Sequence, residues 1–291
     1  MDIESLSGAA TVALASTLVF VLVAKSWQLI SRTVGAQPSF PDSIMREAAQ
    51  RFRDEFERLS ARQATYLSAG VVFIVLFTAA YTLDAARLFS GYPHWQLYLL
   101  LAALTAGALL VARRLVRIAL HRRQVGLQRD ANIAIGHQLQ RLANGLGRVY
   151  HDVETSTGIL DHVIIGSAGA YAVSVVARPV AKNGVVSIAG SELGFGPVGD
   201  SLGLVETGER VASLEREFRR LLDHRVRVRS VIAVPGWEIG QQGGEEHLLV
   251  NERTLPMLRG WKDKADFLMN DDVDALHECM TRRCRRVARD R

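Results

Sequence analysis

The residues best placed to do chemistry lie in a predicted β-hairpin between residues 158 and 178. Two apolar runs are joined there by the turn 166–169, and the first run carries one acid, Asp161, near its start. Alternate residues of a strand share a face, so Ser174 and Val176 of the second run point the same way. A hard divalent cation normally takes several oxygen ligands, including more than one carboxylate. This set of side chains supplies only one carboxylate.

The hairpin and its surroundings resemble the nuclease-related domain (NERD) family, a branch of the PD-(D/E)xK nuclease superfamily. The matching words in the hairpin are Asp161-His162-Val163-Ile164-Ile165-Gly166, Gly169-Ala170-Tyr171 and Ala177-Arg178. Residues 135–139 resemble the opening of the family's first core helix, and residues 230–235 resemble its late core strand. The resemblance covers roughly residues 126–262 and implies an αβββαβ, restriction-endonuclease-like core in an α/β domain.

Periodicity along the chain agrees with that order of elements. The apolar patterns predict a helix up to residue 146, then strands, a helix over 206–224 and a buried strand over 228–234. The predicted strands before the second helix are 148–153, 159–165, 170–177 and 184–189.

The resemblance also implies a chemistry, nuclease action with one or two divalent ions that polarise the phosphate and activate water. In the family pattern, Asp on one strand is joined by Glu and Lys two residues apart on the next. Here Asp161 keeps the first position, while Ser174 and Val176 replace Glu and Lys. His137 stands where the helix carries Glu, so the candidate metal ligands are Asp161 and His137, a pair better suited to zinc or manganese than to magnesium. We therefore expect a catalytically degenerate domain without a cofactor, or with Mg²⁺ or Mn²⁺ if it is active.

Two alternatives stay open at this site. Relocated groups would restore an active nuclease: Asp152 or Glu154 for the missing carboxylate, and Arg178 or Lys182 for the missing lysine. Alternatively, Asp161 caps or braces the hairpin and has a structural role.

The end of the chain is strongly basic. The candidate nucleic-acid or lipid contacts are Arg282, Arg283, Arg285, Arg286 and Arg289. Arginines of this kind contact the phosphates of DNA or RNA without reading sequence, and they also suit anionic lipid headgroups or the end of a solvated helix. The net charge of +5 fits either anionic partner.

Three uncharged apolar runs precede the α/β domain, at residues 8–24, 64–83 and 95–112. Each has about the 17 to 25 residues that a helix needs to cross a bilayer. Arginines are concentrated after the first and third runs, which favours an N-terminus outside and a cytoplasmic C-terminal domain. The sequence therefore predicts three transmembrane helices and a multi-pass protein of the bacterial inner membrane, with the lipid bilayer as a partner.

The predicted domains are a membrane domain over 1–125, the NERD-like domain over 126–262 and a basic helix or tail over 263–291. Within the first, residues 41–62 carry apolar residues at spacings of three and four, which predicts a cytoplasmic amphipathic helix. The leading hypothesis is a membrane-anchored, inactive nuclease-related domain that binds nucleic acid or a protein partner. The alternatives are an active metal-dependent nuclease with a relocated site, and a structural membrane scaffold that self-associates.

Overall fold

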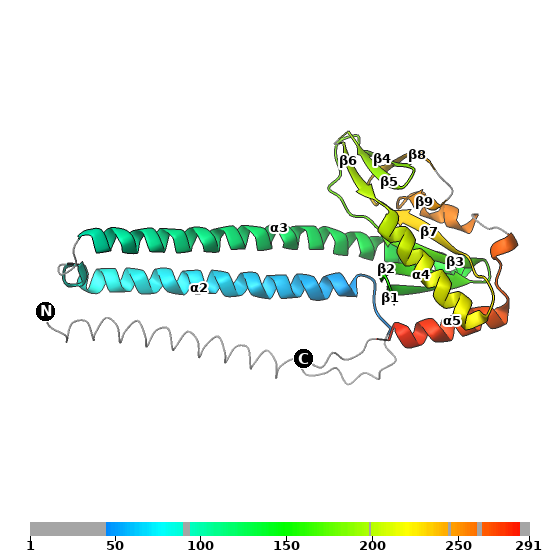
Figure 1. Ribbon diagram of the computed structural model, residues 1–291, viewed down its shortest axis with the longest axis horizontal. Coiled ribbons are helices and arrows are strands. Elements are labelled where there is room, and N and C mark those ends of the chain that lie inside the picture. The colour runs from blue at the N-terminus through cyan, green and yellow to red at the C-terminus, as the bar shows by residue number, and fades with distance from the viewer. Residues whose placement is uncertain (1–44, 90–93, 198, 244–245, 261–263, 286–291) are drawn as a thin grey trace. The chain divides into compact units, whose positions relative to one another are not determined.

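The computed structural model describes residues 45–89, 94–197, 199–243, 246–260 and 264–285 (Figure 1). These residues divide into two compact units, which are described separately. One unit holds residues 58–121, and the other holds residues 45–57 together with 122–285. Two long helices, α2 (Gln50–Phe89) and α3 (His94–Leu146), supply residues to both units.

The prediction of a three-helix membrane domain is wrong. In the described part of the chain, no helix combines the length and the apolar character needed to span a bilayer. The runs 64–83 and 95–112 are stretches of α2 and α3, and both helices continue into sequence rich in arginine. The run 8–24 lies outside the described residues. The predictions that depended on these spans are corrected with them: the inner-membrane, multi-pass localisation, the orientation, the membrane-anchored function and the membrane scaffold.

The main sheet has five strands in the order β1-β2-β3-β7-β9. Its strands are β1 (Arg148–Thr155), β2 (Gly158–Gly166), β3 (Gly169–Val175), β7 (Val228–Ala233) and β9 (His247–Val250). The first three are antiparallel neighbours, whereas β3, β7 and β9 run parallel. The turn between β2 and β3 requires glycine at Gly169, because its φ is +120° and a Cβ there would lie 3.0 Å from the Asp266 carbonyl oxygen.

A smaller sheet lies beside the main one, with strand order β6-β5-β4-β8. Its strands are β4 (Val185–Ala189), β5 (Glu192–Gly196), β6 (Asp200–Gly203) and β8 (Glu238–Gln242). Phe195 and Trp237 pack edge to face, with ring centroids 5.1 Å apart, in a core shared with Ile232 of β7. The short turns η1 (Leu255–Arg259) and η2 (Lys264–Asp266) follow β9.

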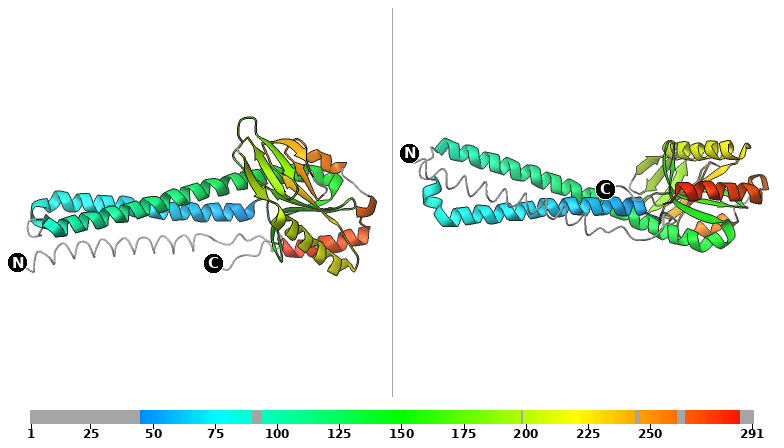
Figure 2. Two further views of the ribbon diagram at one scale, coloured as in Figure 1. Left: turned by 45° about the horizontal axis from the view of Figure 1, so that its top comes forward. Right: turned by 90° about the horizontal axis from the view of Figure 1, so that it is seen from below.

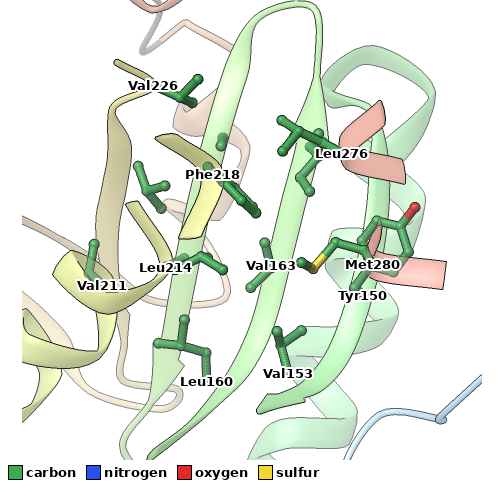
Figure 3. Packing of buried hydrophobic residues seen from close by; sticks show 14 of the residues in the cluster. Tyr150, Val153, Leu160, Val163, Val211, Leu214, Phe218, Val226, Leu276 and Met280 are labelled. Carbon is green, nitrogen blue, oxygen red and sulfur yellow. The ribbon is translucent and has the colours of Figure 1, made fainter. Parts of the chain in front are cut away.

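Helices cover both faces of the main sheet. One face packs against α4 (Val205–Leu222) and α5 (Asn270–Arg283), as Figure 2 and the close view in Figure 3 show. The opposite face packs against the C-terminal part of α3. In α4 the apolar residues Val211, Leu214 and Phe218 recur at spacings of three and four, so they share the face turned to the sheet. The helices on both faces therefore pack against β1, β2 and β3, the strands that carry the candidate site.

Candidate functional site

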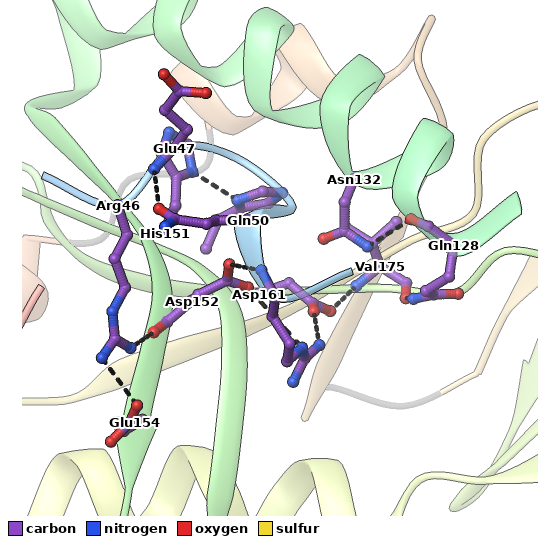
Figure 4. A network of polar contacts seen from close by, with 12 residues as sticks. Arg46, Glu47, Gln50, Gln128, Asn132, His151, Asp152, Glu154, Asp161 and Val175 are labelled. Carbon is purple, nitrogen blue, oxygen red and sulfur yellow. Dashed lines mark hydrogen bonds and ion pairs between the residues drawn. The ribbon is translucent and has the colours of Figure 1, made fainter. Parts of the chain in front are cut away.

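The carboxylate of Asp161 is buried on β2 and accepts a hydrogen bond at each oxygen (Figure 4). Its Oδ1 accepts from Nη2 of Arg51 at 2.8 Å, and this contact is also an ion pair. Its Oδ2 accepts from the backbone N–H of Val175 at 2.8 Å. A side-chain cation of the protein itself therefore provides the counter-charge of Asp161.

Asp152 lies opposite Asp161 on the neighbouring strand. The pairs His151↔His162 and Val153↔Leu160 flank this position, and Asp152 itself has a left-handed φ of +49°. A non-glycine residue with positive φ is uncommon and must be held by its surroundings. Asp152 is held by Arg51, whose backbone N–H donates to Oδ2 at 3.0 Å.

A second arginine of the segment 45–57, Arg46, also contacts β1. Arg46 Nη1 donates to the carbonyl oxygen of Asp152 at 2.8 Å, and its Nη2 lies 2.9 Å from Glu154 Oε1. The backbone N–H of Arg46 donates to the carbonyl oxygen of Cys284 at 2.9 Å. We call Arg46 and Arg51, with the acids Asp152, Glu154 and Asp161, the arginine clamp.

Burial changes the acidity of the clamp. Desolvation raises the pKa of Asp161 to about 6, although Arg51 and the Val175 N–H favour the charged form and partly oppose the shift. The nearby Asp152 adds to the increase, and burial raises the pKa of Asp152 as well. Near pH 7 the carboxylate of Asp161 is mainly ionised, so the ion pair with Arg51 is formed.

The side chains of Gln128 and Asn132 on α3 position the end of β3. Gln128 donates from Nε2 to the Val175 carbonyl oxygen at 2.5 Å and accepts from the Ala177 N–H at 3.1 Å. Asn132 Nδ2 donates to the Gln128 carbonyl oxygen at 2.9 Å. These bonds fix the backbone that offers its N–H to Asp161.

Next to the clamp lies a pair of buried histidines. His151 and His162 approach with Nδ1 atoms 2.8 Å apart and ring planes at 87°. Desolvation lowers the pKa of His151 to about 4 and that of His162 well below its usual value. Both rings are therefore neutral near pH 7, and one Nδ1 donates to the other.

The structure does not bring the predicted metal ligands together. His137 is exposed on α3. Among the described residues, no hydrogen bond or ion pair joins His137 to Asp161. The same residues contain no group of three or more His, Cys, Asp or Glu that could hold a metal ion.

Ser174 and Val176, the positions of the family's Glu and Lys, flank the Val175 N–H. Ser174 is buried on β3 opposite Ile232, and Val176 is half-buried against the smaller sheet's core. Of the relocated candidates, Arg178 pairs with Asp200 at 2.8 Å and lies over Phe195. Arg178 therefore already has a partner in the smaller sheet.

The C-terminal arginines separate into different environments. Arg283 pairs with Glu217 of α4 at 2.5 Å and donates to the Glu154 carbonyl oxygen at 3.1 Å. Arg282 and Arg285 are exposed, while Arg286 and Arg289 lie outside the described residues.

Neither arginine of the clamp, Arg46 or Arg51, was predicted from the sequence as a partner of these acids. Arg51 lies next to Phe52 of the apolar stripe in residues 41–62, and nothing in that local pattern indicates a partner 110 residues away. Comparison of the chain with family models, with curated proteins and with solved structures finds no match. The NERD resemblance therefore stays a prediction.

Proposed function

We propose that the α/β unit is a non-catalytic binding module in which the arginine clamp takes the place of a nuclease metal site. The observation that carries the proposal is the double engagement of Asp161, by the Arg51 guanidinium at one oxygen and by the Val175 N–H at the other. The proposal includes the resemblance of residues 126–262 to the NERD family. In that family's pattern, the carboxylate at the position of Asp161 would be a metal ligand.

Charge and side-chain chemistry both favour this reading over hydrolysis. A divalent cation at Asp161 would meet the positive charge of Arg51 at close range and would have to displace it. The hydroxyl of Ser174 and the isopropyl group of Val176 supply neither an anionic metal ligand nor a general base near pH 7. The clamp instead joins the segment 45–57 to β1 and β2, which is a structural use of the same carboxylates.

The test is a cleavage assay on the full-length chain with single- and double-stranded DNA and RNA, in Mg²⁺ and in Mn²⁺. We expect no cleavage that depends on the divalent ion, and no difference between the wild type and Asp161→Asn. Titration with Mn²⁺, followed by the loss of the free-ion EPR signal, should show no tight site that the substitution removes. Cleavage that requires Mn²⁺ and disappears in Asp161→Asn would overturn the proposal.

A further inference from the structure

A polar groove of about 450 Å³ lies between α5 and the start of β1, and none of the acids of the arginine clamp lines it. The α5 residues that line it are spaced three and four apart, so they share the face opposite Leu276 and Met280, which are buried against the sheet. Its volume falls in the range of roughly 300 to 1,000 Å³ found for small-molecule sites. The groove is therefore large enough for a compact ligand.

The floor of the groove is tied to the sheet. His277 lines the groove, and its Nδ1 lies 2.8 Å from the hydroxyl of Tyr150 on β1. Desolvation and the neighbouring Arg148 lower the pKa of His277, so its ring is neutral near pH 7. The positive charge of the groove comes from arginines alone.

Both positive and negative side chains line the groove. Thr281 and Arg282 lie toward the C-terminal end of the α5 face and Arg285 follows the helix, while Arg148 comes from β1 and its charge acts on His277. Asp274 and Glu278 line the opposite, N-terminal part. Arg282 also lies 3.4 Å from Glu278, and because both side chains are largely exposed this ion pair contributes little to stability. The groove thus offers guanidinium and hydroxyl donors together with carboxylate acceptors.

We propose that this groove binds a small phosphate monoester that carries hydroxyl or amino groups, such as a phosphorylated sugar. Guanidinium groups bind phosphate oxygens by charge-assisted, often paired hydrogen bonds, and a phosphate has enough oxygens to be shared between arginines of two elements. Asp274 and Glu278 would accept hydrogen bonds from the hydroxyl or amino groups. The C-terminus of α5 opposes an anion by roughly half an elementary charge, which the arginines outweigh.

The acids also select against a long polyanion. A nucleic-acid strand along this face would pass Asp274 and Glu278, and then Asp271 of the first helical turn, and each would repel its phosphates. A ligand with a single phosphate at one end avoids that repulsion. The inference rests on the proposed function in one respect: both take the α/β unit to bind a ligand and not to hydrolyse it.

The test uses ribose 5-phosphate as probe, in calorimetric titrations of the full-length chain. We expect saturable binding that unphosphorylated ribose does not reproduce and that inorganic phosphate reproduces more weakly. Arg148→Gln should weaken binding about tenfold or more, as loss of a charge-assisted hydrogen bond does. Arg220→Gln, an exposed arginine of α4 outside the groove, is the matched control and should change affinity less than twofold.

Circular dichroism establishes that each variant is folded, and Arg285→Gln provides a second groove variant. Absence of saturable binding, or equal weakening by Arg220→Gln, would overturn the inference. So would binding of a 20-nucleotide single strand in place of the sugar phosphate. Because the cleavage assay depends on Asp161 and this titration depends on Arg148, each proposal can fail while the other stands.

Discussion

At the scale of single residues, Arg51 links an aspartate of β1 to an aspartate of β2. Its guanidinium reaches Asp161 while its backbone N–H reaches Asp152, so one residue neutralises a buried carboxylate and holds a strained backbone position. An ion left without its partner in a buried site is costly, by roughly 3 to 5 kcal/mol, because its charge stays desolvated. Arg51 is itself 32% exposed, and solvent reduces that cost.

Replacement of Arg51 by Gln should therefore lower the free energy of unfolding by about 1 to 3 kcal/mol near pH 7.5. Chemical denaturation monitored by circular dichroism measures the change. Arg53→Gln is the matched control, since Arg53 pairs only with the exposed Glu47 in the described structure and should cost less than about 0.5 kcal/mol. Equal losses in the two variants would mean that the clamp has no special role in stability.

The dependence of stability on pH gives a separate test of the same carboxylate. The pKa of Asp161 is raised to about 6 in the folded protein from an ordinary 3.8. Between these values the folded state binds more protons than the unfolded state. The contribution of Asp161 is therefore greatest below about pH 4 and is lost as the pH rises through 6.

Asp161→Asn removes this dependence, because the amide does not ionise. We expect the stability of the variant relative to the wild type to rise by roughly 2 to 3 kcal/mol from pH 4 to pH 7, the size of a two-unit shift. The measurement is urea unfolding of both proteins across that range. The histidines His151 and His162 have an opposite dependence, but they are common to both proteins and cancel in the difference. A difference that is constant with pH would contradict the raised pKa.

At the scale of elements, α4 and α5 fix the sheet that carries the clamp. Phe218 of α4 is 1% exposed and packs in the same cluster as Leu276 and Met280 of α5. Leu221, one turn along α4, is 44% exposed. One face of α4 is therefore buried against the sheet, and another face is exposed to solvent.

Phe218→Ala should destabilise the protein by about 3 to 5 kcal/mol, through lost burial and the cavity left between α4 and the sheet. Leu221→Ala keeps the helix propensity high and should cost less than about 1 kcal/mol. Thermal and urea unfolding of the two variants provide the comparison. A similar small loss in both would show that α4 is not a core element.

Much of the element pattern could be predicted before the fold was seen. The hairpin over 158–178 corresponds to β2 and β3, and the helix over 206–224 corresponds to α4. The apolar run over 228–234 corresponds to the buried strand β7. These predictions rest on periodicity and turn residues, which are properties of neighbouring residues in the chain.

The candidate site was predictable only in part. Asp161, Ser174 and Val176 were predicted from the resemblance of the hairpin to the NERD family, and the structure places them near the end of β3. The arginine that pairs with Asp161 was not identified, and neither was Gln128, which bonds the Val175 and Ala177 backbone 47 and 49 residues away. Contacts of this kind depend on where distant segments meet.

At the scale of the whole molecule, the same difference between local sequence patterns and the complete structure explains the wrong prediction of a membrane domain. The runs 64–83 and 95–112 look like membrane spans when they are read alone, but in the structure they are stretches of helices of 40 and 53 residues that also carry charged sequence. The sequence by itself determined the hairpin and the buried strand, because alternation and turn chemistry act over a few residues. Only the tertiary structure decided that Arg51 neutralises Asp161, because the partner of a buried charge is set by the path of the chain and not by the residues next to it in sequence.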